Sequence, residues 1–191
     1  MRRLWSLFSI RKRVPAGAEP FEDGMAAYQR GDYATALKFL RPLAEQGNPQ
    51  AQYTLGYIYA EGVGVPADDG EAVKLYRKAA KQGDADAQNE LGAMYAAGRG
   101  VSQDHSEAVK WFRKAAEQGH REAQHNLGSM YYVGEGVPRD LVQAHMWYNI
   151  ADALGDEDGQ KGRDIAANFM TPDQIAEAQR LAWEWMAKHQ R

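Results

Sequence analysis

Histidines are the side chains of this chain best suited to acid–base or metal chemistry at neutral pH. They are His105, His120, His125, His145 and His189. None belongs to a His-Glu-x-x-His zinc motif, and the chain has no cysteine, which excludes thiol catalysis, disulfides and cysteine-bound zinc. The Gly-x-Ser-x-Gly motif of serine hydrolases is also absent. The sequence therefore predicts no catalytic residue, no metal site and no cofactor.

Glycine-rich loops can cradle phosphate groups, and a Gly-x-Gly-Val element occurs three times in this chain. Its copies are Gly62-Val63-Gly64-Val65, Gly98-Arg99-Gly100-Val101 and Gly134-Glu135-Gly136-Val137. No strand is expected before any copy, and no Lys-Ser or Lys-Thr pair follows one, as a phosphate-binding loop would require. We interpret the element as a turn whose first glycine ends a helix in the left-handed conformation.

The recurring acidic residues also have a structural explanation. Three pairs stand three residues apart: Asp68 and Glu71, Asp104 and Glu107, and Asp140 and Gln143. This is the spacing of a capping box, in which the first side chain accepts a hydrogen bond from the third helical N–H group and the second reaches back. A pair of catalytic carboxylates cannot be distinguished from these helix caps.

The elements that carry these residues repeat every thirty-six positions. The segment AQYTLGYIYAEGVGVPAD from Ala51 returns in altered form from Ala87 and from Ala123. A fixed period of this size is typical of a stacked repeat array, and each unit reads as two helices. In the first unit we expect a helix over about 49–60, capped by Asn48, and a second helix that opens at Asp68.

Small and aromatic residues recur within these helices. Gly56, Gly92 and Gly128 lie in the middle of the first helices, where glycine is unfavourable, so we expect close contact between helices there. The second helices repeat an apolar face of alanines with an aromatic or leucine pair, as in Leu75 and Tyr76.

This pattern of Ala-x-x-x-Leu-Gly-x-x-Tyr, Gly-x-Gly-Val and Ala-Ala-x-x-Gly resembles the Sel1-like repeat, a relative of the tetratricopeptide repeat. The resemblance covers Ala51 to Gly155, with the units at 48–83, 84–119 and 120–155. It implies an all-α, right-handed α-solenoid of antiparallel helix pairs whose first helices line the concave side. It also implies a scaffold for protein–protein interaction.

The ends of the array depart from the pattern. We expect a tetratricopeptide-like helix pair at 21–47 and two capping helices within 156–191, the second opened by Thr171 and Gln174. Trp183 falls off the apolar stripe of that last helix. We expect it to pack against the preceding helix, with an exposed anchor for a partner as the alternative.

Charge and hydropathy narrow the range of partners. The 191 residues carry a net charge of −3, which argues against nucleic acid, and no apolar run approaches the ~20 residues of a transmembrane helix. A basic stripe is expected to be a solvated convex face; it comprises Lys74, Arg77, Lys78, Lys81, Lys110, Arg113 and Lys114. Residues 1–20 are basic, and two interpretations stay open: an export signal, or a weakly amphipathic tail that is disordered or rests on an anionic membrane surface.

By analogy with tetratricopeptide arrays, the concave surface receives the residues two before, two after and five after the leucine of each first helix. These are Tyr53, Tyr57, Ala60, Asn89, Ala93, Ala96, His125, Ser129 and Tyr132, with Asp86 and Glu122 at the rim. This set suits a peptide with apolar and basic side chains. The tyrosines could equally pack between helices.

Two other functions remain as alternatives. A hydrolase acting on cell-envelope material would use groove residues such as His125 and Glu122, and a membrane-peripheral structural protein would use residues 1–20. The compartment follows the same division: the protein is exported or periplasmic if residues 1–18 are a signal peptide, and cytoplasmic otherwise.

Overall fold

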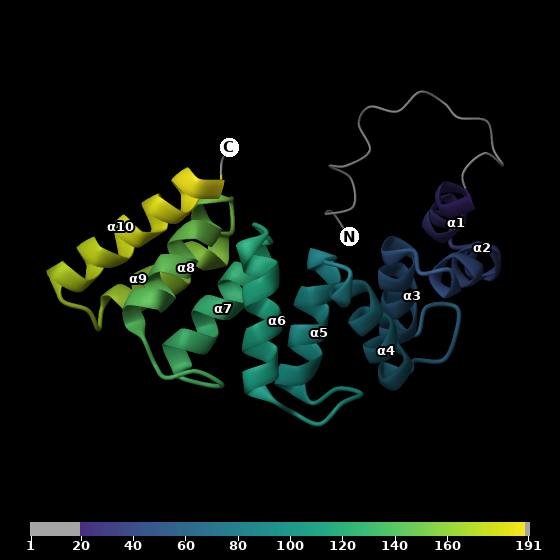
Figure 1. The fold of residues 1–191 in the computed structure, drawn as a ribbon, viewed down its shortest axis with the longest axis horizontal. Helices are drawn as coiled ribbons and strands as arrows, with labels where there is room; N and C mark the ends of the chain where they lie inside the picture. The colour runs from purple at the N-terminus through teal and green to yellow at the C-terminus, as the bar shows by residue number, and fades with distance from the viewer. Residues whose placement is uncertain (1–19, 190–191) are drawn as a thin grey trace.

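The computed structural model describes residues 20–189, and in this range every regular element is a helix. The helices are α1 (Pro20–Gln29), α2 (Tyr33–Glu45), α3 (Pro49–Glu61), α4 (Asp69–Lys81), α5 (Ala85–Ala97), α6 (His105–Glu117), α7 (Arg121–Val133), α8 (Leu141–Ala153), α9 (Glu157–Ala167) and α10 (Pro172–His189). They follow one another along a single curved row (Figure 1). The predicted α-solenoid is therefore confirmed. The two interpretations of residues 1–20 concern a segment that lies, apart from Pro20, outside the described residues.

We call the first helix of each unit (α3, α5 and α7) the inner helix and the second (α4, α6 and α8) the outer helix. The inner helices begin at the expected caps. The N–H group of Ala51 donates to the Asn48 side chain at 2.9 Å, and that of Ala87 donates to Asp84 at 2.8 Å. In the third unit His120 takes the same role, with its Nδ1 accepting from Ala123 at 3.1 Å. An imidazole can replace a carboxylate here because its unprotonated nitrogen carries one lone pair.

The outer helices form only half of each predicted capping box. Asp68 accepts from the Glu71 N–H group at 2.9 Å, but the Glu71 carboxylate binds Lys74 instead of reaching back. The N–H group of Asp68 is already bonded to the Tyr59 carbonyl at 2.9 Å, so the reciprocal prediction is wrong. A complete box occurs at α10, where Thr171 and Gln174 exchange hydrogen bonds at 2.9 and 3.3 Å.

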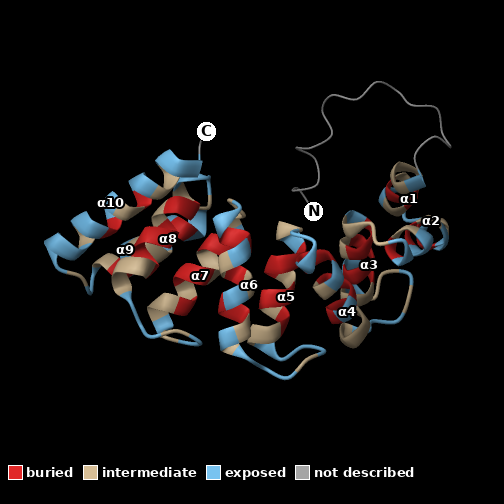
Figure 2. Ribbon diagram, in the orientation of Figure 1, coloured by how far each residue is buried: buried red, intermediate tan, exposed pale blue. Residues whose placement is uncertain are grey.

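The two helices of a pair lie close together at the glycines in the middle of the inner helices. A Cβ atom at Gly56 would lie 2.7 Å from the Tyr76 ring, and one at Gly92 would lie 2.8 Å from Phe112. The predicted close contact is thus confirmed. Buried residues occur along the row and group into three clusters, while the loops are mostly exposed or intermediate (Figure 2). The core therefore extends along the array and has no single centre.

Each Gly-x-Gly-Val loop connects the two helices of one unit and contacts the preceding unit. Gly62 and Gly98 end their helices with positive φ values of 65° and 70°, as predicted. The second glycine meets the preceding unit: a Cβ atom at Gly100 would lie 2.2 Å from the carbonyl oxygen of Asp69. Only glycine fits where a loop lies this close to the backbone of another helix.

Residues between the two loop glycines also contact the preceding unit. The Arg99 guanidinium binds the Asp69 carboxylate, and thirty-six residues later Glu135 lies 3.5 Å from Nδ1 of His105. The two boundaries therefore use the same two positions, with the acidic and the basic residue exchanged.

Glutamine amides link the outer helices to the inner helices. Gln82 donates to Gln52 at 2.8 Å, and Gln118 donates to Gln88 at 2.7 Å. The series ends at the third unit, because Leu154 occupies the next equivalent position. The Oε1 atom of the fully buried Gln124 consequently has no hydrogen-bond partner among residues 20–189.

Two arginines of the basic stripe are not simply solvated. Arg77 donates to the Tyr95 hydroxyl and Arg113 to the Tyr131 hydroxyl, each at 2.8 Å. Each bond joins an outer helix to the inner helix of the next unit. The expectation of a wholly solvated stripe is wrong for these residues, because the neighbouring inner helix supplies an acceptor.

The last two helices cover the third unit in different ways. Helix α9 lies against α8 and α7, whereas α10 folds back onto α8, with the Trp185 and Trp147 rings 5.8 Å apart. Trp183 is 68% exposed, so the expected packing of this residue is wrong. It lies on the side of α10 that faces away from α8. No helix within 20–189 has the length and apolarity needed to cross a membrane.

Candidate functional site

The inner helices α3 and α5 place tyrosines and carboxylates on one surface. Tyr53, Tyr57 and Glu61 follow at four-residue intervals on α3, and Asp86 and Glu90 do so on α5. Residues four apart share a helix face, so each helix contributes one row. Tyr57 is 40% exposed and Asp86 is exposed, as expected for groove residues.

Tyr53 is packed more deeply than Tyr57. Its ring lies 5.8 Å from that of Tyr76, and burial, followed by the nearby Asp86 carboxylate, raises the pKa of its hydroxyl. Tyr53 therefore contributes mainly to the packing between α3 and α4, which was the alternative interpretation of the tyrosines.

Asn89 does not face the solvent. It is only 2% exposed, and its Oδ1 atom accepts a hydrogen bond from Asn126 at 3.0 Å. The expectation that Asn89 contacts a partner directly is wrong. At this position α5 faces the next inner helix, so the amide pairs with α7 and fixes the spacing of the two helices.

The predicted partner-binding residues of α7 do not lie beside those of α3 and α5. The His125 ring meets Tyr148 edge-on at 5.3 Å, and the Ser129 hydroxyl is 3.0 Å from the Tyr148 hydroxyl. Nδ1 of His125 lies 3.6 Å from Asp156. Tyr132 contacts Phe169, with ring centres 6.4 Å apart. These side chains are half-buried between α7, α8 and α9, away from the α3–α5 surface, and Glu122 remains exposed on α7.

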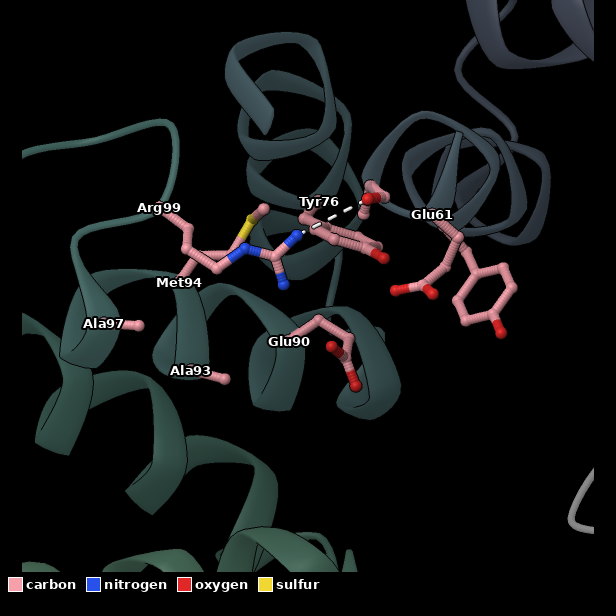
Figure 3. A pocket seen from close by; sticks show the side chains of 9 residues that line it. Glu61, Tyr76, Glu90, Ala93, Met94, Ala97 and Arg99 are labelled. Carbon is pink, nitrogen blue, oxygen red and sulfur yellow. Dashed lines mark hydrogen bonds between the residues drawn. The ribbon is translucent and has the colours of Figure 1, made fainter. Parts of the chain in front are cut away.

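A pocket of about 160 Å³ opens between α3, α4 and α5 (Figure 3). It is lined by Tyr57, Ala60, Glu61, Tyr76, Glu90, Ala93, Met94, Ala97 and Arg99. The sequence prediction included Tyr57, Ala60 and Ala93 but missed Glu61, Glu90 and Arg99. The four-residue period could have found the first two, because Glu61 follows Tyr57 and Glu90 follows Asp86 at that interval.

The charged side chains of this pocket differ in whether another residue of the protein compensates their charge. Arg99 donates to both Asp69 oxygens, at 2.7 and 3.3 Å, and to the Ala60 carbonyl at 3.4 Å, so an internal carboxylate already compensates its charge. Burial, and then the negative charge of Glu122, raises the pKa of Glu90. Both causes disfavour the ionised form, and a nearby cation would favour it.

Comparison with known proteins identifies the family of this chain. The Sel1 repeat model matches residues 21–48, 49–84, 85–120 and 121–156, the first of which is the N-terminal helix pair. No curated protein matches the chain significantly. Among solved structures, a Sel1 repeat protein from Oxalobacter formigenes is similar, with 33% identity, a TM-score of 0.74, and coverage of 88% of this chain and 70% of that one.

Two further structures extend the comparison. A protective antigen of uropathogenic Escherichia coli strains that displays an SLR fold has 31% identity and a TM-score of 0.64, over 89% of this chain and 45% of its own length. This chain thus spans less than half of that antigen. Helicobacter pylori cysteine rich protein B shares the fold at 21% identity and a TM-score of 0.52, over 76% of this chain and 98% of that one. The chain belongs to the Sel1 repeat family, a class of repeat scaffolds generally used for protein interactions.

Proposed function

We propose that this protein is a non-enzymatic scaffold that holds a segment of a partner protein along its inner surface. We define the inner surface by Tyr57, Glu61, Asp86, Glu90 and Glu122, on helices α3, α5 and α7. The observation that carries the proposal is the pocket on this surface, where residues of two consecutive repeats meet.

The physical support is preorganisation. The inner helices are held by caps, buried amides and close glycine contacts, so a partner segment would bind with little ordering of the scaffold. Carboxylates on the inner surface would speed the approach of basic segments and select against acidic ones. Within residues 20–189, no group of three or more histidine, aspartate or glutamate side chains is placed to hold a metal ion.

Selection of displayed peptides on the full chain tests this function. We expect enriched peptides to bind in solution, and to lose about tenfold or more in affinity in a Tyr57→Ala, Glu90→Gln variant, since a few central side chains carry most binding energy. Lys74→Gln, on the exposed side of α4, is the control and should bind as the unmodified protein does. Peptides that bind both variants equally, or a selection that enriches none, would contradict the proposal.

A further inference from the structure

The pocket between α3, α4 and α5 has the size of a single side chain. Its volume of about 160 Å³ is well below the ~300–1,000 Å³ of sites that enclose whole small molecules. It also opens on the inner surface that we propose for the partner, so this inference rests on the proposed function. Its occupant would therefore be one residue of a bound segment.

A tyrosine that is almost wholly buried lines this pocket, and its hydroxyl is unpaired within residues 20–189. Tyr76 is only 1% exposed, and within residues 20–189 its hydroxyl forms no hydrogen bond. Figure 3 shows its ring extending from α4 into the space beside Glu61. This hydroxyl is therefore available to form a hydrogen bond with an occupant of the pocket.

The carboxylates around the pocket indicate the charge of that occupant. Glu61 enters from α3 and Glu90 from α5, and neither forms an ion pair within 20–189. Arg99 is the cationic side chain in the pocket lining, and it is already paired with Asp69. The two glutamates thus leave the pocket negatively charged. A cation placed between them would gain from both without displacing an existing pair.

Apolar atoms form the remaining wall. Ala60, Ala93, Met94 and the ring of Tyr57 belong to this part of the lining. A long side chain with an aliphatic stem and a charged end matches this mixed lining, because the stem can pack on the apolar atoms while the charge reaches the carboxylates. Tyrosine faces add cation–π attraction.

We propose that this pocket receives the lysine or arginine side chain of a partner segment, with its charged end between Glu61 and Glu90 and a hydrogen bond to the Tyr76 hydroxyl. The inner surface would thereby select segments with a basic residue at one position. Its other contacts would depend on the remaining side chains of the partner.

Nuclear magnetic resonance of the full chain tests the proposal with Nα-acetyl-lysine methylamide as the probe. We expect saturable shifts of the Ala93 and Met94 methyl signals with this compound and with its arginine counterpart. Nα-acetyl-norleucine methylamide, which has a comparable stem without the charge, should leave them unchanged. Equal shifts with norleucine would overturn the proposal, because the pocket would then bind any apolar chain.

Variants identify the groups responsible. Glu90→Gln should weaken lysine binding about tenfold, the loss of one charge-assisted contact, and Tyr76→Phe should weaken it about threefold. Glu45→Gln, which removes an exposed carboxylate of α2, is the charge-matched control and should have no effect. Lysine binding that is unchanged in Glu90→Gln would also overturn the proposal.

The basic N-terminal segment is the competing occupant. If a variant with Arg11→Gln, Lys12→Gln and Arg13→Gln shifts the Met94 signal without any probe, the pocket holds the chain's own residues, and the assignment to a partner is overturned. Displayed peptides that bind through Tyr57 while the lysine probe fails would remove this inference and leave the proposed function in place.

Discussion

The guanidinium of Arg99 donates hydrogen bonds to both carboxylate oxygens of Asp69, at 2.7 and 3.3 Å, across the boundary between two repeats. A double-mutant cycle of Asp69→Ala and Arg99→Ala should give a coupling free energy of about 0.5–1 kcal/mol in urea unfolding. The coupling is modest because both side chains are partly exposed, and it should shrink in 1 M salt. The pair of Glu71 and Lys74 within α4 gives a reference cycle, and a boundary pair that couples no more strongly at any salt concentration would contradict the prediction.

Replacing Leu154 by glutamine should stabilise the protein. The buried Oε1 atom of Gln124 lacks a partner within 20–189, and Leu154 stands where Gln118 reaches Gln88 in the preceding unit. A restored hydrogen bond should raise the free energy of unfolding by about 0.5–1.5 kcal/mol. Leu154→Met, with an unbranched chain but no donor, is the matched control. Equal stability of the two variants in urea unfolding would show that the amide is not needed.

Two glycine substitutions separate backbone strain from steric overlap. Gly100 and Gly119 both have positive φ, 64° and 86°, so alanine at either should cost about 1–2 kcal/mol. A Cβ atom at Gly119 has nothing within 4 Å, whereas one at Gly100 would overlap the Asp69 carbonyl. Gly100→Ala should therefore destabilise by a further 1–3 kcal/mol or so in urea unfolding. Equal losses would mean that the loop can move away from α4 freely.

Stability should depend on the protonation of His145. Burial, and then the positive charge of Arg163, lowers its pKa in the folded protein, and the side chain is only 2% exposed. The unfolded chain therefore binds the proton more tightly, and the free energy of unfolding should fall as the pH drops below about 6.5. The slope contributed by one proton is at most about 1.4 kcal/mol per pH unit.

Urea unfolding between pH 7.5 and 5.5 measures this slope, and His145→Gln should reduce it. Burial raises the pKa of Asp84 and Glu90, which gives a contribution of the opposite sign, but both proteins share it and their comparison isolates His145. Parallel pH profiles for the two proteins would contradict the role of His145.

The sequence predicted the features that depend on one helix pair. Asn48 as a cap, Gly56 at a close contact and Gly98 at a helix end all follow from rules that act within a few residues or recur three times. Asn89 was mispredicted because its burial depends on how α5 and α7 are inclined to each other, which no local pattern contains. Trp183 was mispredicted because α10 packs on α8.

The sequence predicted only some of the residues that line the pocket, for a related reason. Glu61 and Glu90 come from different repeats, and Arg99 comes from a loop in which its side chain appeared to be interchangeable. Their proximity results from the stacking of units, so position within a unit says little about it. The thirty-six-residue period therefore predicts the fold but does not identify residues that act between neighbouring units.

The exchange of the acidic and the basic residue between the two repeat boundaries has a consequence for the gene. Neighbouring copies of a tandem repeat readily recombine, and loss of the unit that carries Arg99 and His105 would place Glu135 beside Asp69. Two carboxylates would then meet where an ion pair now stands. The residues at the boundaries are thus matched to the present order of the units. A shortened array would need a second mutation to regain the contact.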